Sequence, residues 1–144
     1  MEFDLTELLP HRNRMKLVDR VVSADEKRAV TRSTVTSRWP LFDGRAVDAM
    51  VIIELVAQTA GISNGIERTR KDGPGADKKG WLVGIKQARF ARSTLALGDT
   101  VEVRAENSFE FEGFREICGI AVLGDETIGE VTLQVMQADS DPIP

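Results

Sequence analysis

The chain of 144 residues is long enough for one ordinary domain with a substantial core and too short for two, so we expect a single domain over residues 1–144. Its charged fraction of 29% and hydrophobic fraction of 42% are typical of a soluble globular protein. The net charge of −4 excludes a global attraction to nucleic acid or to anionic lipid, so an acidic partner requires a local basic patch.

The sequence disfavours both a membrane protein and a disulfide-rich secreted protein. The first residues, MEFDLTE, are acidic, whereas a secretory signal peptide begins with basic residues. No apolar run approaches the length of a membrane-spanning helix. The lone cysteine, Cys118, has no internal disulfide partner, and we expect it to be a small buried apolar residue of a strand. These features predict a cytoplasmic protein.

The first predicted elements are a strand pair and a long helix. Met15–Val22 and Arg28–Val35 have strand patterns and are joined by the polar turn Ser23–Lys27. Asp48–Arg70 is the one long helix candidate, because it contains good helix formers, an acidic residue at its start and basic residues toward its end. It is apolar on nearly every side, so we expect the helix to be buried all round.

A charged loop containing glycine and proline, Arg70–Gly80, separates this helix from a series of strand patterns. Apolar and polar residues alternate along these strands, so each is expected to have one buried and one solvated face. The dipeptides Glu112-Gly113 and Gly124-Asp125 predict tight turns and therefore an antiparallel meander. The predicted strands are Trp81–Phe90, Thr100–Phe111, Phe114–Leu123 and Thr127–Met136.

One buried helix and several long antiparallel strands combine most economically as a curved sheet wrapped around the helix, an α+β fold. The helix segment AMVIIELVAQTAG carries a carboxylate at Glu54 and an amide at Gln58. An ionised carboxylate is costly to bury without partners, so Glu54 is either paired or used in chemistry. Gln58 lies four residues later on the same helix face, where its amide can hold the carboxylate or touch a substrate.

Three motifs that follow one another along the chain carry a family resemblance. They are LLPHR followed by MKLVDRV, the helix motif VIIELVAQ, and GIKQARF with a later Gly-Asp. In this order they resemble the hot-dog-fold 3-hydroxyacyl-acyl-carrier-protein dehydratases, and most closely the divergent dehydratase-like branch of aryl polyene pathways. The resemblance implies a hot-dog fold without a cofactor. It also implies a homodimer, or a heterodimer with a related hot-dog subunit, whose active sites lie at the interface.

The resemblance also implies a site. In these dehydratases a helix carboxylate and a loop histidine act together on a 3-hydroxyacyl thioester of acyl carrier protein or CoA, while backbone amides at the helix start polarise the thioester oxygen. Glu54 takes the carboxylate position. The aromatic residues before the helix are candidates for lining an acyl tunnel. The substrate-binding positions that we predict are Trp39, Phe42, Ala49, Gln58 and Gly84.

The loop histidine of the family is missing from this chain. The family spacing places Pro40 there, and Asp48-Ala49 replaces the proline-glycine that starts the family's helix. Three explanations stay open. His11 supplies the second catalytic group, or the chain pairs with a catalytically complete homologue, or Glu54 works with water alone as in a thioesterase. The first choice is a dehydratase of fatty acid or polyene/polyketide biosynthesis; the alternatives are a non-catalytic partner subunit and an acyl thioesterase.

The sequence also bears on a carrier-protein surface and on metal binding. Basic residues near the third motif and the N-terminus either receive the acidic surface of an acyl carrier protein or form a solvated face. One histidine and one cysteine do not make a convincing metal cluster, and we predict no metal site. The basic residues in question are Arg12, Arg14, Lys86, Arg89 and Arg92.

Overall fold

The computed structural model of the chain describes residues 16–73 and 80–137. Most of these residues belong to antiparallel strands, and a single long helix is found among them. In chain order the elements are β1 (Arg20–Ala24), β2 (Arg28–Thr34), β3 (Ala46–Asp48), α2 (Val51–Asp72), β4 (Gly80–Phe90), β5 (Thr94–Ala96), β6 (Thr100–Phe111), β7 (Phe114–Leu123) and β8 (Glu126–Gln137).

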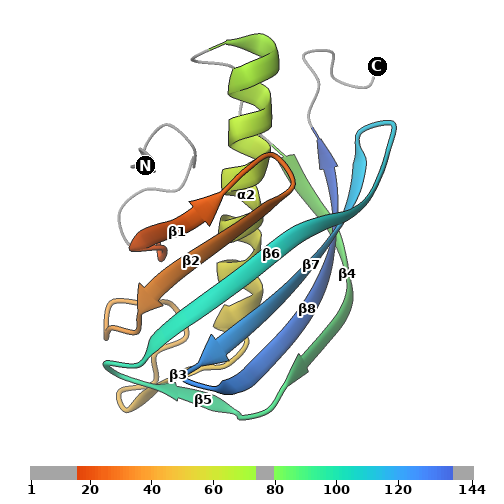
Figure 1. The fold of residues 1–144 in the computed structure, drawn as a ribbon. Helices are drawn as coiled ribbons and strands as arrows, with labels where there is room; N and C mark the ends of the chain where they lie inside the picture. The colour runs from red at the N-terminus through yellow and green to blue at the C-terminus, as the bar shows by residue number, and fades with distance from the viewer. Residues whose placement is uncertain (1–15, 74–79, 138–144) are drawn as a thin grey trace.

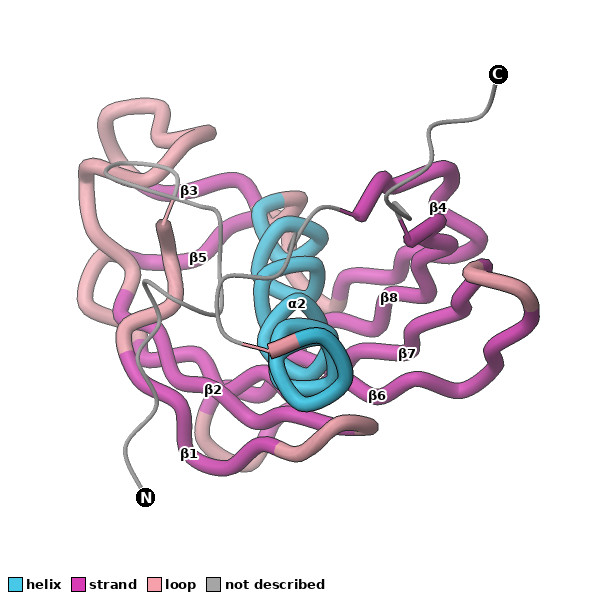
Figure 2. Tube along the Cα trace, turned by 90° about the horizontal axis from the view of Figure 1, so that it is seen from above, coloured by secondary structure: helices cyan, strands magenta, loops and turns pink. Residues whose placement is uncertain are grey.

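Six of the strands form one curved antiparallel sheet in the order β1-β2-β6-β7-β8-β4 (Figure 1). Viewed nearly along its axis, α2 lies in the hollow of this sheet (Figure 2). The short strands β3 and β5 pair separately and lie near the N-terminal end of the helix. The predicted α+β architecture, a curved sheet wrapped around a central helix, is confirmed.

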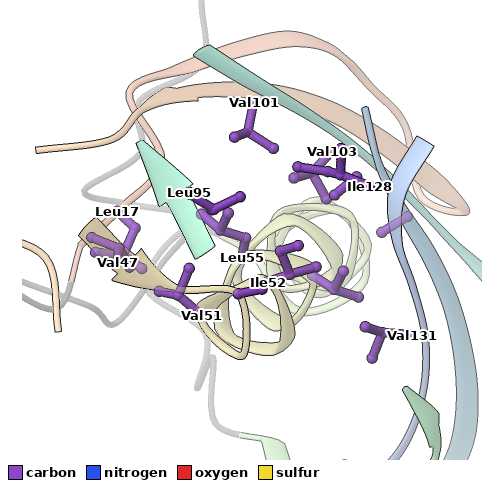
Figure 3. Packing of buried hydrophobic residues seen from close by; sticks show 14 of the residues in the cluster. Leu17, Val47, Val51, Ile52, Leu55, Leu95, Val101, Val103, Ile128 and Val131 are labelled. Carbon is purple, nitrogen blue, oxygen red and sulfur yellow. The ribbon is translucent and has the colours of Figure 1, made fainter. Parts of the chain in front are cut away.

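The core fills the space between α2 and the inner face of the sheet. Ile52 and Leu55 of the helix are fully buried among apolar side chains of the surrounding strands (Figure 3). Burying one such side chain contributes about 1.5–3 kcal/mol to the free energy of unfolding. The strand residues labelled in the figure are Val47, Leu95, Val101, Val103, Ile128 and Val131.

Two glycines allow the helix to approach the sheet closely. A Cβ atom on Gly119 of β7 would lie 2.4 Å from a methyl carbon of Val56, and one on Gly129 of β8 would lie 2.9 Å from Ile52 Cδ1. Both separations are shorter than van der Waals contact, so any side chain there would push the helix outward. The depth of α2 in the sheet therefore depends on these two positions.

The side of α2 that faces away from the sheet is only half-buried among the described residues. Ile53, Glu54, Ala57 and Gly61 have intermediate exposure, whereas the helix residues that face the strands are buried. The prediction that the helix is buried on all sides is therefore wrong for this chain. The sheet wraps around only one side of the helix cylinder and leaves these residues half-buried on the other side.

Most predicted strands are confirmed. Both ends of β6 and β7 agree with the sequence prediction, and β2, β4 and β8 differ by no more than one residue at each end. The first strand begins at Arg20, not at Met15, which lies outside the described residues. The prediction of a buried Cys118 is wrong, because the alternation along β7 places it on the outer, exposed face of the sheet.

The helix begins later than predicted. Residues Ala46–Asp48 form β3, which pairs with β5, so α2 starts at Val51 instead of Asp48. The side chain of Asp48 nevertheless acts at the helix start, because its Oδ1 accepts a hydrogen bond from the Met50 N–H at 2.9 Å. The sequence correctly indicated an acidic residue near the helix start, but the pairing of β3 with β5 moves that start from Asp48 to Val51.

An ionic cluster around the buried Arg115 joins the C-terminal half of α2 to β7 and β6. The guanidinium of Arg115, which is 1% exposed, donates to Glu67 Oε2 at 2.8 Å and to Glu110 Oε1 at 3.2 Å. Lys71 Nζ donates to the other oxygen of Glu67 at 2.6 Å, and Arg115 also binds Asn64. A buried charge that loses its partner costs several kcal/mol, so the members of this cluster hold one another in place.

The Glu67 carboxylate predicts how stability changes with pH. Burial raises the pKa of Glu67, but the hydrogen bond from Lys71 and the charge of Arg115 outweigh it and hold the pKa below the usual 4.5. A carboxylate with a lowered folded-state pKa contributes stability above its unfolded-state pKa, and that stability is lost as the pH falls through the folded-state value. We expect the free energy of unfolding, measured with urea, to decrease between about pH 5 and about pH 3.

In Glu67→Gln the same pH range should change the free energy of unfolding less, although this variant is less stable than wild type at neutral pH. Glu106→Gln, which alters an exposed glutamate on β6, is the control and should keep the wild-type slope. Parallel curves for wild type and Glu67→Gln would contradict the assignment.

Candidate functional site

Glu54 lies in the first turn of α2, on the half-buried side of the helix. One turn later, the fully buried Gln58 donates a hydrogen bond from its Nε2 to Glu54 Oε1 at 3.0 Å. A spacing of four residues places the two side chains on one helix face. The structure thus brings the two polar residues of this helix segment together.

The amide group of Gln58 has a defined orientation. Its Oε1 accepts hydrogen bonds from the backbone N–H of Leu17 at 2.9 Å and, more weakly, of Val18 at 3.4 Å. Backbone donors face the amide oxygen and a carboxylate faces the amide nitrogen. Rotating the amide by about 180° would place its nitrogen against the backbone donors and its oxygen against the carboxylate. Gln58 therefore ties the segment before β1 to Glu54. His11 lies farther upstream, outside the described residues.

The loop before α2 is held by its own hydrogen bonds. Phe42 and Val47 form an isolated β-bridge. Between them, Asp43 Oδ1 accepts the N–H groups of Ala46 at 3.0 Å and Arg45 at 2.8 Å. The hydrogen bond from the Ala46 N–H, and after it the one from Arg45, hold the pKa of Asp43 below its usual value. Asp43 is therefore an ionised cap of this turn.

The aromatic residues of this loop differ in burial. Trp39 is 6% exposed and belongs to the hydrophobic core. Phe42 is half-buried and packs against the core from outside. Pro40, which stands where the family has its histidine, is also half-buried. A tunnel-lining role of Trp39 and Phe42 stays a prediction, and of the two only Phe42 has appreciable exposed surface in this structure.

The backbone amide of Ala49 already has an acceptor. It donates to the carbonyl oxygen of Ser93 at 2.9 Å, which connects the helix start to the segment between β4 and β5. The next amide, that of Met50, is taken by Asp48. A thioester oxygen could use the Ala49 N–H only by sharing it with Ser93 or displacing it, so we do not assign the oxyanion contact to this group.

Gly84, the remaining predicted substrate-binding position, lies on β4, at one edge of the sheet. The pairing of β4 with β8 shifts register between Leu82 and Gly84. A Cβ atom on Gly84 would come within 2.8 Å of Gln134 Oε1. The glycine therefore leaves room for the side chain of Gln134, and a contact with substrate stays a prediction.

Two of the three described cations of the predicted basic patch are paired with glutamates. Lys86 Nζ lies 3.0 Å from Glu116 Oε1, and Arg92 Nη2 lies 2.9 Å from Glu126 Oε2. Arg89 has no ion pair with a described residue. Paired cations attract an acidic partner less than unpaired ones, so this patch is weaker than the sequence alone indicates. Arg12 and Arg14, the other two residues of the predicted patch, lie outside the described residues.

The described residues offer neither a metal site nor a membrane-spanning helix. Across 16–73 and 80–137, no three His, Cys, Asp or Glu side chains gather in a way that could hold a metal ion. The long helix in that part of the chain is not apolar enough to cross a membrane.

Comparison with known proteins identifies the family. A family model described as ApeP dehydratase matches residues 3–143. The chain belongs to the ApeP-like dehydratase family. This family member is also 31% identical over 143 residues to the 3-hydroxyacyl-[acyl-carrier-protein] dehydratases FabZ of Caldanaerobacter subterraneus subsp. tengcongensis and Anaeromyxobacter sp. (strain K). The matches cover 94% and 95% of this chain and 96% and 90% of those relatives.

Solved structures with the same fold agree. The dehydratase heterocomplex ApeI:P from Xenorhabdus doucetiae has a TM-score of 0.84 at 18% identity, covering 97% of this chain and 94% of that one. Cj0977, a sigma28-regulated virulence protein from Campylobacter jejuni, has a TM-score of 0.71 at 20% identity, covering 94% and 96%. The predicted hot-dog fold and the predicted branch are confirmed for this ApeP-like dehydratase.

Sequence reasoning missed two parts of the site. The backbone N–H groups of Leu17 and Val18 carry no residue-type signal, because every residue except proline has one. The Phe42–Val47 bridge did have a signal: the Asp43-Gly44 that lies between these apolar residues is a hairpin dipeptide. The first omission needed the fold, whereas the second was available from the sequence.

Replacing Gln58 tests the link between the N-terminal segment and Glu54. Gln58→Leu keeps most of the side-chain volume but leaves the Leu17 N–H and the Glu54 oxygen without their amide partner. We expect a loss of about 1–3 kcal/mol in the free energy of unfolding and faster hydrogen exchange at Leu17 and Val18. The matched control is Gln134→Leu on β8. Unchanged exchange at residues 17 and 18 would show that Gln58 does not hold this segment.

Proposed function

We propose that this ApeP-like chain takes part in the dehydration of 3-hydroxyacyl thioesters carried by an acyl carrier protein, with Glu54 as its acid–base carboxylate. The observation that carries the proposal is the hydrogen bond from the buried Gln58 to Glu54 on the half-buried side of α2. The 31% identity to relatives named 3-hydroxyacyl-[acyl-carrier-protein] dehydratases supports the substrate class.

Dehydration requires one base and one acid. The base removes a proton from the carbon next to the thioester carbonyl, and the electrons of that C–H bond form the new C=C bond. The hydroxyl group on the next carbon leaves with a proton from the acid, so one water is released and no other reactant is needed. A carboxyl group can serve in either role, and Gln58 orients the carboxyl of Glu54 by donating to one of its oxygens.

The second catalytic group has two proposed sources. His11 of the same chain precedes the segment that Gln58 holds through Leu17, which supports an intramolecular pair. A histidine of a related hot-dog subunit is the alternative, supported by Pro40 at the histidine position and by the similar fold of a dehydratase heterocomplex. In that case this chain contributes Glu54 to a composite site and is inactive alone.

We propose that the related or identical subunit pairs along β4. This strand is an edge of the six-stranded sheet and is 11 residues long, whereas β1 at the other edge has five. Leu82, Val83 and Ile85 on β4 are 50%, 59% and 47% exposed. An uncovered edge strand with large apolar side chains is prone to pair with another chain. Pairing there would complete a site that the monomer lacks.

Substituting the edge strand tests this interface. We expect Ile85→Lys to raise the dissociation constant of the dimer about tenfold or more, because a charge would be buried where an apolar side chain packs. The control is Val22→Lys, which adds the same charge to β1 at a residue that is 42% exposed. Sedimentation or mass photometry provides the measurement. Equal effects of the two substitutions would exclude β4 as the preferred edge.

The chemical proposal is tested by intact mass spectrometry of a 3-hydroxyacyl carrier protein incubated with the purified chain, alone and with a hot-dog dehydratase subunit that has the loop histidine. We expect loss of one water, slowed about 10²- to 10⁴-fold in Glu54→Gln. The control Glu106→Gln alters an exposed carboxylate on β6 and should leave the rate unchanged. His11→Gln is measured in parallel to assign the second group.

The outcomes separate the possible functions. Water loss by the chain alone that disappears in His11→Gln identifies an intramolecular pair. Water loss only in the presence of the second subunit, still sensitive to Glu54→Gln, identifies a composite site. Release of the free carrier identifies a thioesterase and contradicts the proposal, as does a rate that is indifferent to Glu54 under every condition.

A further inference from the structure

The direction of the hydrogen bond between Gln58 and Glu54 bears on the charge of the carboxyl group. Gln58 is fully buried, and its Oε1 already accepts the backbone N–H groups of Leu17 and Val18. The end of the amide that faces Glu54 is therefore its nitrogen, which donates to Glu54 Oε1 at 3.0 Å. The backbone of the segment before β1 thus decides that Glu54 meets a donor on this side.

A donor of fixed orientation favours the ionised form of a carboxyl group. A carboxylate accepts a stronger hydrogen bond than the neutral acid does, so an N–H group that cannot turn away stabilises the charge. With the amide of Gln58 the other way round, its oxygen would accept the proton of a neutral Glu54 and hold that residue as an acid. The structure has the opposite arrangement, which prepares Glu54 to accept a proton.

The place of Glu54 in the helix acts in the same direction. Glu54 lies in the first turn of α2, where the positive end of the helix dipole stabilises a negative charge. Half-burial disfavours the charge, but a half-buried carboxylate keeps part of its contact with water. Asp48, just before the helix, is exposed and accepts the Met50 N–H, so solvent screens its repulsion of Glu54. These contacts together favour an ionised Glu54 before the reaction begins.

We propose that Glu54 is the general base of the dehydration and that the second group, a protonated histidine, is the general acid. This inference rests on the proposed function, in which the carboxyl group could serve in either role. The carboxylate takes the proton from the carbon next to the thioester carbonyl, and the electron pair of that C–H bond becomes the C=C bond. The C–O bond to the hydroxyl group breaks, and this group leaves as water with the proton of the histidine. Solvent then removes the proton from Glu54 and returns one to the histidine, so no further reactant is consumed.

A leaving group that needs no proton separates the two roles. Fluoride departs as an anion, whereas a hydroxyl group departs as water and needs a proton, so elimination from a 3-fluorooctanoyl carrier protein requires the base but not the acid. Fluoride release is followed with a fluoride electrode, and water loss from the 3-hydroxyoctanoyl carrier protein is followed by intact mass spectrometry. Both rates are corrected for the rate without protein. Each is measured with the chain alone and with a hot-dog dehydratase subunit that has the loop histidine.

We expect Glu54→Gln to slow both reactions about 10²-fold or more, because both need the base. Replacing the histidine, either by His11→Gln or in the second subunit, should slow water loss by a similar factor and spare fluoride release. The matched control Glu106→Gln alters an exposed carboxylate of β6 and should change neither rate. In Glu54→Ala, added formate should restore part of the fluoride release, because a small carboxylate can replace the missing base but cannot repair a misfolded protein. Thermal unfolding of every variant is recorded.

The outcomes separate this inference from the proposed function. Fluoride release that survives Glu54→Gln while water loss disappears makes Glu54 the acid and overturns the inference alone. Fluoride release that is lost with the histidine overturns it as well, and so does a protein that removes water but releases no fluoride. Fluoride release that depends on Glu54, without water loss from the 3-hydroxy substrate under either condition, contradicts the proposed function alone.

Discussion

The close approach of α2 to the inner face of the sheet is the constraint on which the rest of the structure depends. Val56 lies over Gly119 and Ile52 lies over Gly129, with no side chain between helix and strand. Because protein interiors are close-packed, such contacts fix both the depth and the rotation of a helix. Glu54 follows Ile52 by two residues, a rotation of about 200°, so anchoring Ile52 on the sheet turns Glu54 away from it.

The buried amide of Gln58 fixes the orientation of the Glu54 carboxylate on this side of the helix. A buried amide without partners costs about 1–3 kcal/mol, so a fold that places Gln58 in the interior must supply groups for both of its ends. Here the oxygen receives the backbone of Leu17 and the nitrogen faces Glu54. The same two contacts therefore stabilise the fold, hold the segment before β1 and orient a carboxylate on the accessible side of the helix.

The two ends of α2 serve different purposes. At the C-terminal end, the ion pair of Arg115 with Glu67 is largely removed from water and locks the helix to β7, while the exposed Lys71 pairs with the other oxygen of Glu67. At the N-terminal end, Arg38 and Arg45 stay exposed and unpaired with described residues, and Leu41 is held in a strained conformation. The charged side chains at the C-terminal end thus hold the helix in place, whereas Arg38 and Arg45 stay exposed at the N-terminal end, where Glu54 lies.

Local pattern sufficed for much of the fold. Alternation with a period of two located β6 and β7, and the helix with Glu54 and Gln58 was predicted from its good helix formers and from the charges at its two ends. The order of three motifs was enough to indicate the family. The pattern failed where pairing between distant segments competes with it: β3 pairs with β5 and takes the residues that were predicted to start the helix.

What the sequence by itself determined is the type of each long element, the family and the candidate carboxylate, because these depend on residue types at short spacing. Only the tertiary structure decided which face carries Cys118, that the Ala49 amide is occupied by Ser93, and that Gln58 joins Leu17 to Glu54. Each of these depends on which backbone groups meet after the chain has folded. Backbone donors and acceptors are the same at almost every residue, so no sequence pattern distinguishes the pairs that form.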